Sequence, residues 1–203
     1  MNEKFKLEKG GSMDRKEEIL EAASRVFERY GLAKSTLEDI AKECGIKKTA
    51  LYYYFKNKEE LFKTMFVNDI ENIKEYISQK IESEGSTLKK IRMYMILRVK
   101  SLEKMRKYFD IFQGDNASAS YRDFAFGEKE KVIHFEIESL TDVISKGVKK
   151  RELEVENIKS LAFIIMGATY GLTHEFLCLN NDIDTDKEVD NILDILLKGI
   201  EFK

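Results

Sequence analysis

TLEDIAKECGIKKTALYYYFKNK, residues 36–58, holds two short apolar-periodic segments that flank a glycine. In each segment the apolar residues are spaced so that they share one face of a helix. Gly45 permits a sharp turn between the segments, and a small residue at position 41 lets two helices cross closely. The pattern predicts a helix-turn-helix with helices over residues 37–44 and 47–55. The residues expected to face inward are Leu37, Ile40, Ala41, Ile46 and Leu51.

Helices are also expected on both sides of this motif. Residues 14–30 carry apolar side chains three and four apart, and Gly31 supplies a C-terminal stop. A capping box is expected before residue 37, either Ser35 with Glu38 or Thr36 with Asp39. Asn57 is the expected N-cap of a long helix over residues 57–83, with Glu60 as its box partner.

The rest of the chain predicts an all-α fold. The 203 residues include no proline, and Lys, Glu, Leu and Ile recur with a helical period. Further helices are expected over residues 87–107, 128–150, 157–180 and 186–202, and residues 108–126 are expected to form a short helix and a loop. The predicted architecture is an N-terminal three-helix helix-turn-helix domain over residues 13–58, then a helical bundle over residues 59–203. Residues 1–12 are a polar leader expected to be mobile, with Met13 as an alternative start.

Composition excludes several classes of protein. Two cysteines cannot form a disulfide framework, and two histidines give no zinc-finger spacing. No apolar run approaches the length of a membrane-spanning helix, and the N-terminus lacks the apolar core of a secretory signal. We therefore expect a cytoplasmic protein with no metal site, no cofactor and no membrane partner. The net charge is −2, so an anionic partner requires a local basic patch.

Basic charge is concentrated at the end of the helix-turn-helix. Residues 44–58 hold four lysines and no acid: Lys47, Lys48, Lys56 and Lys58. Lysines of this kind neutralise phosphates, and the three consecutive tyrosines add hydroxyls and rings that contact phosphate or base edges. The alternative is that the lysines form a solvated face and that at least one tyrosine is core. Because the charge follows two short helices joined by a glycine turn, we expect double-stranded DNA to be bound here.

Residues 19–61 resemble the DNA-binding domain of the TetR family of transcriptional regulators. The family's Phe-x-x-x-Gly pattern is matched by Phe27 and Gly31, and its Thr, gap, Ile-Ala pattern by Thr36, Ile40 and Ala41. The family's Leu-Tyr-x-Tyr-Phe-x-x-Lys-x-x-Leu pattern is matched by Leu51, Tyr52, Tyr54, Phe55, Lys58 and Leu61. The resemblance implies a three-helix DNA-binding domain followed by a helical domain that binds a ligand and dimerises.

The resemblance also implies which residues contact DNA. Thr36, Tyr52, Tyr54 and Lys58 match positions that hold the DNA backbone, and Lys48, Thr49, Ala50 and Tyr53 match positions that face the major groove. Lys47 stands where the family often has a capping serine, so the cap is expected to be weaker or to come from elsewhere, and Thr49-Ala50 replaces the frequent Gly-Thr. The candidate DNA-binding residues are Thr36, Lys47, Lys48, Thr49, Ala50, Tyr52, Tyr53, Tyr54 and Lys58. Far from this motif, Arg151 stands where the family often has glycine, so a left-handed backbone there would be strained.

The last two predicted helices are the candidate dimer interface. A helix-turn-helix reads a palindrome as a dimer with recognition helices about 34–36 Å apart. Residues 160–179 are apolar on more than one face, and residues 186–202 carry a regular apolar stripe. Tight packing within one subunit is the alternative, whereas the resemblance implies a four-helix bundle between subunits. The candidate interface residues are Leu161, Ile164, Ile165, Ala168, Leu172, Ile192, Leu193, Leu196 and Ile200.

Aromatic residues are concentrated in the middle of the chain, where they predict an adaptable apolar pocket. The alternative for each of them is ordinary core packing, and for the two histidines a satisfied position in the core. The candidate ligand-binding residues are Phe66, Tyr94, Tyr108, Phe109, Phe112, Phe124, Phe135, Tyr170 and His174. The expected effector is a small apolar or amphipathic molecule.

These features together predict a dimeric, ligand-responsive transcriptional regulator. By the family's usual mode it is a repressor that an effector releases from a palindromic operator. The alternative is a constitutive DNA-binding regulator without a ligand pocket. An enzyme is not expected, because the sequence has no glycine-rich phosphate loop, no nucleophile elbow and no paired histidine ligands.

Overall fold

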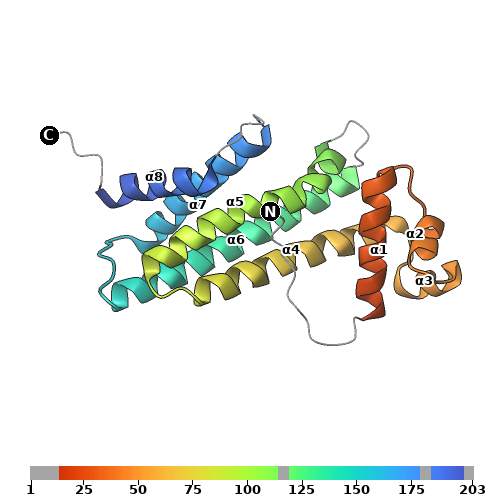
Figure 1. The fold of residues 1–203 in the computed structure, drawn as a ribbon, viewed down its shortest axis with the longest axis horizontal. Helices are drawn as coiled ribbons and strands as arrows, with labels where there is room; N and C mark the ends of the chain where they lie inside the picture. The colour runs from red at the N-terminus through yellow and green to blue at the C-terminus, as the bar shows by residue number, and fades with distance from the viewer. Residues whose placement is uncertain (1–13, 114–118, 179–183, 199–203) are drawn as a thin grey trace. The chain divides into compact units, whose positions relative to one another are not determined.

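The computed structural model describes residues 14–113, 119–178 and 184–198 (Figure 1). Within these ranges the chain forms eight helices and no strand, which confirms the all-α fold. The helices are α1 (Arg15–Tyr30), α2 (Leu37–Glu43), α3 (Lys48–Tyr54), α4 (Lys58–Glu82), α5 (Thr87–Gln113), α6 (Ala119–Lys149), α7 (Ile158–Cys178) and α8 (Thr185–Lys198).

The chain divides into two compact units. Unit 1 comprises Met1–Ile73 and Lys107–Phe124, and unit 2 comprises Lys74–Arg106 and Ala125–Lys203. Helices α4, α5 and α6 each contribute residues to both units. The functional division at residue 58 stays a prediction.

Helix α1 ends where the sequence predicts. Its buried face is formed by Ile19, Leu20, Ala22, Ala23, Val26 and Phe27. Gly31 follows with a φ of 76°, and its N–H donates to the Phe27 carbonyl at 2.9 Å. Because a side chain at this φ is strained, glycine is the residue suited to ending this helix.

Helices α2 and α3 form the predicted helix-turn-helix, and α2 packs against both α1 and α3 (Figure 1). The capping box before α2 is the Thr36 and Asp39 pair. Gly45 has a φ of 70°, and the next N–H, that of Ile46, donates to the Ala41 carbonyl at 2.9 Å. Ile46 itself is only half-buried, so it fills the turn incompletely. The inward residues are Leu37, Ile40, Ala41 and Leu51, as expected.

Helix α4 begins with a different box from the one expected. The Asn57 side chain accepts from the Glu60 N–H at 2.8 Å, which confirms the N-cap. The Glu60 carboxylate, however, accepts from the N–H of Lys56 at 2.8 Å and not from that of Asn57. The glutamate therefore ties α4 to the residue before the cap.

Two predicted boundaries in the middle of the chain are wrong. Helix α5 continues to Gln113 instead of ending near residue 107, and α6 begins at Ala119 instead of near residue 128. Tyr108 explains the first difference, because it is buried and its hydroxyl donates to Asp69 at 2.7 Å, so tertiary contacts hold this part helical. Gly127 lies inside α6 without interrupting it. Residues 114–118 lie outside the described residues.

Unit 2 has its own apolar core, with Met95 of α5, Leu140 and Ile144 of α6, and Ile165 of α7 nearly inaccessible to solvent. After α6, Arg151 has a φ of 60°, so this residue takes the left-handed backbone that is strained for a residue with a side chain. No helix among the described residues is long and apolar enough to cross a membrane.

Candidate nucleic-acid interface

The outer face of α3 is a polar, aromatic and basic surface. Lys47, Lys48, Thr49 and Ala50 are exposed, and the exposed fractions of Tyr52 and Tyr53 are 49% and 86%. The prediction that at least one of the three tyrosines is core is wrong, because Tyr54 is only half-buried and packs edge-on against Tyr53. Leu51 and Phe55 supply the buried contacts instead, so all three tyrosines remain accessible.

Helix α3 is held from its inner side and not by a cap. Lys47 makes no side-chain cap hydrogen bond, which confirms the weak cap expected from a lysine at this position. Leu51 is fully buried, and Phe55 is 1% exposed. The helix before it is tied to α1 by Glu43, whose carboxylate pairs with Arg25 at 2.8 Å and Arg29 at 3.7 Å. Leu51 and Phe55 therefore anchor α3 with its polar face exposed.

Lys48 carries an ion pair that the sequence pattern does not reveal. Its ammonium lies 3.2 Å from the carboxylate of Glu38 on α2, and both side chains are substantially exposed. Exposed pairs of this kind contribute little to stability. The pair instead orients Lys48 across the helix-turn-helix while leaving it accessible.

Thr36 is engaged by its own helix. Its hydroxyl accepts from the Asp39 N–H at 3.2 Å and donates to the Asp39 carboxylate at 2.7 Å, and its N–H donates to the same carboxylate. The hydrogen bond from the Thr36 hydroxyl, followed by that from its N–H, lowers the pKa of Asp39. Thr36 therefore fixes the start of α2.

Lys58 is also engaged within the protein. Its ammonium donates to the backbone carbonyls of Leu32 at 2.7 Å, Ser35 at 2.8 Å and Ala33 at 3.4 Å. An ammonium has three donors, so these carbonyls match its capacity. Burial lowers the pKa of Lys58. The side chain expected to hold a DNA phosphate thus holds the loop between α1 and α2.

The sequence model of the family described as "Bacterial regulatory proteins, tetR family" matches residues 19–65. This range contains the helix-turn-helix and the exposed face of α3. This part of the chain is a TetR-family DNA-binding domain. TetR-family proteins are regulators and not enzymes.

Individual relatives of the chain are also described as transcriptional regulators or repressors. The uncharacterized HTH-type transcriptional regulator YhgD of Bacillus subtilis is 38% identical over 71 residues, which cover 35% of this chain and 37% of that protein. The match thus spans about a third of that relative. A "probable acrEF/envCD operon repressor" of Escherichia coli K12 is 22% identical over 94% of this chain and 88% of that protein. The structure of the regulator FadR of Bacillus subtilis with stearoyl-CoA is similar to this one, with a TM-score of 0.63 and 18% sequence identity. The match covers 91% of this chain and 99% of FadR, and at this identity it shows the fold alone.

The residues predicted to bind an effector are distributed between the two units. Phe66, Tyr108 and Phe124 lie in unit 1, and Tyr94, Phe135 and Tyr170 lie in unit 2. The side chains of Phe109, Phe112 and His174 lie outside the described residues.

In unit 1 the predicted residues belong to an aromatic cluster. Phe66 packs edge-on against Tyr108 and Phe124 with ring centroids 4.8 and 5.7 Å away, and Phe62 joins them against Tyr108 and Tyr121. Phe66 and Tyr108 are buried. Packing of this kind is what core residues make, so it matches the alternative of ordinary core packing for these two.

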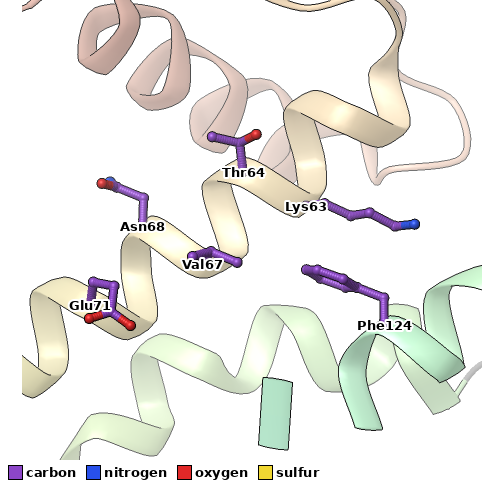
Figure 2. Close-up of a pocket in the computed structure, with 6 residues that line it drawn as sticks. All are labelled: Lys63, Thr64, Val67, Asn68, Glu71 and Phe124. Atoms are coloured by element: carbon purple, nitrogen blue, oxygen red, sulfur yellow. The ribbon is translucent and has the colours of Figure 1, made fainter. Parts of the chain in front are cut away.

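Beside this cluster is a shallow groove of about 420 Å³, open to solvent. Figure 2 shows that five of its lining side chains come from α4 and one, Phe124, from α6. Lys63 lies 5.2 Å from the centre of the Phe124 ring and pairs with Glu59 at 2.7 Å. The α4 residues are Lys63, Thr64, Val67, Asn68 and Glu71. The groove is open to solvent and lacks the enclosure of a small-molecule site.

Unit 2 contains a buried polar cluster formed by Tyr94 and Arg98 of α5, Glu136 of α6 and Tyr170 of α7. Arg98 Nε donates to Glu136 Oε1 at 2.5 Å, and Nη2 donates to the Tyr170 hydroxyl at 3.4 Å. Burial is the largest single influence and opposes the charge on Arg98, but the Glu136 carboxylate together with Tyr170 and Tyr94 raises the pKa of the guanidinium. The two tyrosines are among the residues predicted from the sequence, whereas Arg98 and Glu136 are not. The only sequence signal for this pair is that each is a charged residue within an otherwise apolar stretch.

The predicted dimer residues also divide into two groups. Ile165 and Leu172 are 1% and 8% exposed within a single chain, and on α8 Leu193 is buried too, so these three belong to the core of unit 2. Ile164 is 51% exposed, Leu161, Ala168, Ile192 and Leu196 are half-buried, and the side chain of Ile200 lies outside the described residues. Phe163 and Ile195, exposed by 47% and 55%, were not predicted.

Proposed function

We propose that this chain is a dimeric transcriptional repressor that binds a palindromic operator and is released by a small apolar or amphipathic effector. The observation that carries the proposal is the exposed face of α3, where Lys47, Lys48, Tyr52 and Tyr53 all reach solvent from a helix fixed by Leu51. Lysines beside accessible tyrosines match the two kinds of contact that DNA offers, phosphates and base edges. The proposed site of action is the cytoplasm.

The residues of this face have separate roles in the proposal. Lys48, Thr49, Ala50 and Tyr53 face the major groove, while Lys47, Tyr52 and Tyr54 contact the backbone of the operator. Thr36 and Lys58 support binding by positioning the motif, because their polar groups are engaged by Asp39 and by the loop carbonyls.

The proposed dimer uses an exposed apolar face of α7. Phe163 and Ile164 are about half exposed, and one and two turns later Gly167 and Gly171 are exposed with open space around them. Packing within the same subunit, the alternative for these glycines, is disfavoured because a Cβ added at either would contact nothing within 4 Å. An exposed apolar face with small residues lets a second helix approach closely. In unit 2, Ile195 of α8 adds a further exposed apolar side chain.

Two observations bear on the effector. The relative FadR was solved with stearoyl-CoA, so a chain of this fold accommodates a ligand. The aromatic cluster of unit 1 is packed as a core, which favours the alternative of a constitutive regulator as far as that unit is concerned. The proposed effector site is therefore in unit 2. Helix α4 runs continuously from the helix-turn-helix into unit 2 and offers a covalent route for coupling of about 1–3 kcal/mol, a typical size for such effects.

The proposal is tested by fluorescence anisotropy with a labelled fragment from upstream of the protein's own gene and a scrambled fragment of equal length. The wild-type protein is expected to bind the first fragment at least about 1,000-fold more tightly, the lower end for specific binding. Lys48→Ala is expected to weaken binding and to change which base substitutions in the fragment are tolerated. Lys131→Ala, on an exposed side chain of α6, is the matched control and should leave binding unchanged. Equal affinity for both fragments would contradict the proposal.

A further inference from the structure

The buried polar cluster of unit 2 neutralises its own charge. The Arg98 guanidinium pairs with Glu136 at 2.5 Å, donates to Ser101 Oγ at 3.3 Å and to the Tyr170 hydroxyl at 3.4 Å, and lies over the Tyr170 ring. One cation and one anion are thus balanced inside the unit. A ligand carboxylate or phosphate placed here would have to compete with Glu136 for Arg98. A ligand ammonium would place a second positive charge beside the guanidinium. Both charged classes are therefore disfavoured at this position.

Two polar atoms of the cluster nevertheless have no hydrogen-bond partner among the described residues. Among the residues that the structure describes, neither the Tyr94 hydroxyl nor Glu136 Oε2 has a hydrogen-bond partner of acceptable geometry. Tyr94 is 3% exposed and Glu136 5% exposed, so bulk water does not supply the missing bonds. Buried polar groups are normally satisfied, and each orphan raises the free energy of the folded state.

The two orphan atoms are complementary to one group. Burial raises the pKa of Tyr94, so its hydroxyl stays protonated and can donate, whereas Glu136 Oε2 can only accept. The Glu136 carboxylate also raises the pKa of Tyr94, through its charge and through an approach to the hydroxyl that falls short of hydrogen-bond geometry. A single neutral hydroxyl satisfies both, because it accepts from Tyr94 and donates to Glu136.

We propose that Tyr94 and Glu136 anchor the effector and that the effector is an uncharged amphipathic molecule with an alcohol or phenol hydroxyl. This inference rests on the proposed function, because it specifies the ligand of that regulator. The same three helices carry the buried apolar residues Met95, Leu140 and Ile165, so the body of such a molecule has to displace part of this core. Arg98 keeps 14% of its side chain exposed and Tyr170 is half-buried, so the cluster is reached from their side.

The probes for the test are 1-octanol, octanoate and octylammonium, which have eight carbons each and carry a neutral hydroxyl, an anionic carboxylate and a cationic ammonium. Saturation-transfer NMR titrations of the ligand-free protein give an affinity for each. Octanol is expected to saturate, with octanoate and octylammonium at least about tenfold weaker. Octanoate cannot donate to Glu136 and is repelled by it, whereas octylammonium cannot accept from Tyr94 and is repelled by Arg98. Preference for octanoate, or the absence of binding by all three probes, would overturn the inference.

Two variants separate an anchor from an ordinary structural ion pair. Tyr94→Phe keeps the ring and removes the donor, so octanol should bind roughly 3- to 10-fold more weakly while folding is retained. Glu136→Gln removes the counter-ion of Arg98, so the preference should invert in favour of octanoate. If the ion pair were purely structural, Glu136→Gln would not change which of the probes binds most tightly. Unchanged octanol affinity in Tyr94→Phe would contradict the anchor role, and Tyr76→Phe, a half-buried tyrosine of α4 in the same unit, is the matched control.

Glu136→Gln leaves a buried cation, so a double variant guards against loss of folding. Arg98→Met combined with Glu136→Leu removes both charges and should fold but lose the octanol preference. Anisotropy with the upstream fragment is measured on the same samples. DNA binding without octanol binding would overturn this inference alone. Octanol binding without specific DNA binding would overturn the proposed function and leave the ligand site standing.

Discussion

The ammonium of Lys58, the first residue of α4, donates a 2.8 Å hydrogen bond to the backbone carbonyl of Ser35. From the other side, the Ser35 hydroxyl donates to the Gly31 carbonyl at 2.6 Å, and Ser35 is 2% exposed. The loop between α1 and α2 is therefore fixed both by its own serine and by α4. Because this loop leads directly into the helix-turn-helix, Lys58 sets the direction in which α2 and α3 leave the first helix.

Replacing Lys58 by methionine should lower stability more than it changes the electrostatics of DNA binding. Methionine keeps the length of the stem but leaves three loop carbonyls without their donor, at a cost of about 1–2 kcal/mol for partly exposed bonds. Urea unfolding should record this loss. The slope of log affinity against log salt should stay at its wild-type value, because no phosphate contact is removed.

Lys56→Met is the matched control for that variant, because Lys56 is exposed in the same basic segment. If Lys56 neutralises a phosphate, its loss should reduce the salt slope by about 0.9 with little change in stability. A reduced slope and unaltered stability in Lys58→Met would instead assign Lys58 to a phosphate.

Acid should weaken the helix-turn-helix through Asp39. Hydrogen bonds from Thr36 lower the pKa of this carboxyl in the folded protein, so its ionised form stabilises α2. That stability is complete above the ordinary pKa of about 3.9 and is lost as the pH falls through the lower folded value. Asp39→Asn should therefore be less stable than wild type near neutral pH, and the difference should close in acid. Thermal melts followed by circular dichroism across this range measure it. A difference that persists in strong acid would contradict the argument.

Local chemistry made much of the DNA-binding end predictable. The glycines with positive φ, the Thr36 box and the inward apolar residues follow from rules that operate within a few residues. The roles of Lys58 and Glu38 did not follow, because their partners are set by how helices cross and not by spacing in the sequence. In the later two thirds, Arg98 and Glu136 look like surface charges until α5 and α6 bring them together. The helical structure at Tyr108 is not predictable for the same reason, since its contact with Asp69 is tertiary.

Two glycines of α6 should respond to alanine in opposite ways. A Cβ at Gly147 would lie 2.5 Å from Thr87 Oγ1, and Thr87 is buried with its N–H held by Glu152 at 2.7 Å. Gly147→Ala should therefore destabilise the protein by about 1–3 kcal/mol through overpacking. Gly127 has open space around its Cβ position, so Gly127→Ala should stabilise α6 by about 0.5–1 kcal/mol. Urea titrations of both variants give the sign of each change in the free energy of unfolding. Equal changes would show that Thr87 moves to accommodate the added methyl group.

The exposed face of α7 should control assembly. Phe163→Glu places a charge where the proposed dimer buries an aromatic ring, so the dimer dissociation constant should rise by about 100-fold or more. Lys159→Glu, an exposed position one turn earlier, is the matched control and should leave a dimer. Sedimentation velocity distinguishes the two states. A wild-type monomer, or a dimer unaffected by Phe163→Glu, would remove α7 from the interface.

Arg151 should be a site where glycine is better than the native residue. Its φ of 60° lies in the left-handed region, and the chain there closes α6 through hydrogen bonds from the Arg151 N–H to Val148 and from the Glu152 N–H to Gly147. A left-handed backbone costs a residue with a side chain about 1–2 kcal/mol, and glycine removes this strain. Part of the gain is offset because glycine also gives the unfolded chain more conformational freedom. Arg151→Gly should therefore raise the free energy of unfolding by about 0.5–1 kcal/mol. Lys149→Gly, at the last helical residue of α6, should instead lower it by about as much, because its backbone is helical. If both glycines destabilise the protein, the Arg151 side chain makes a contribution that exceeds its backbone strain.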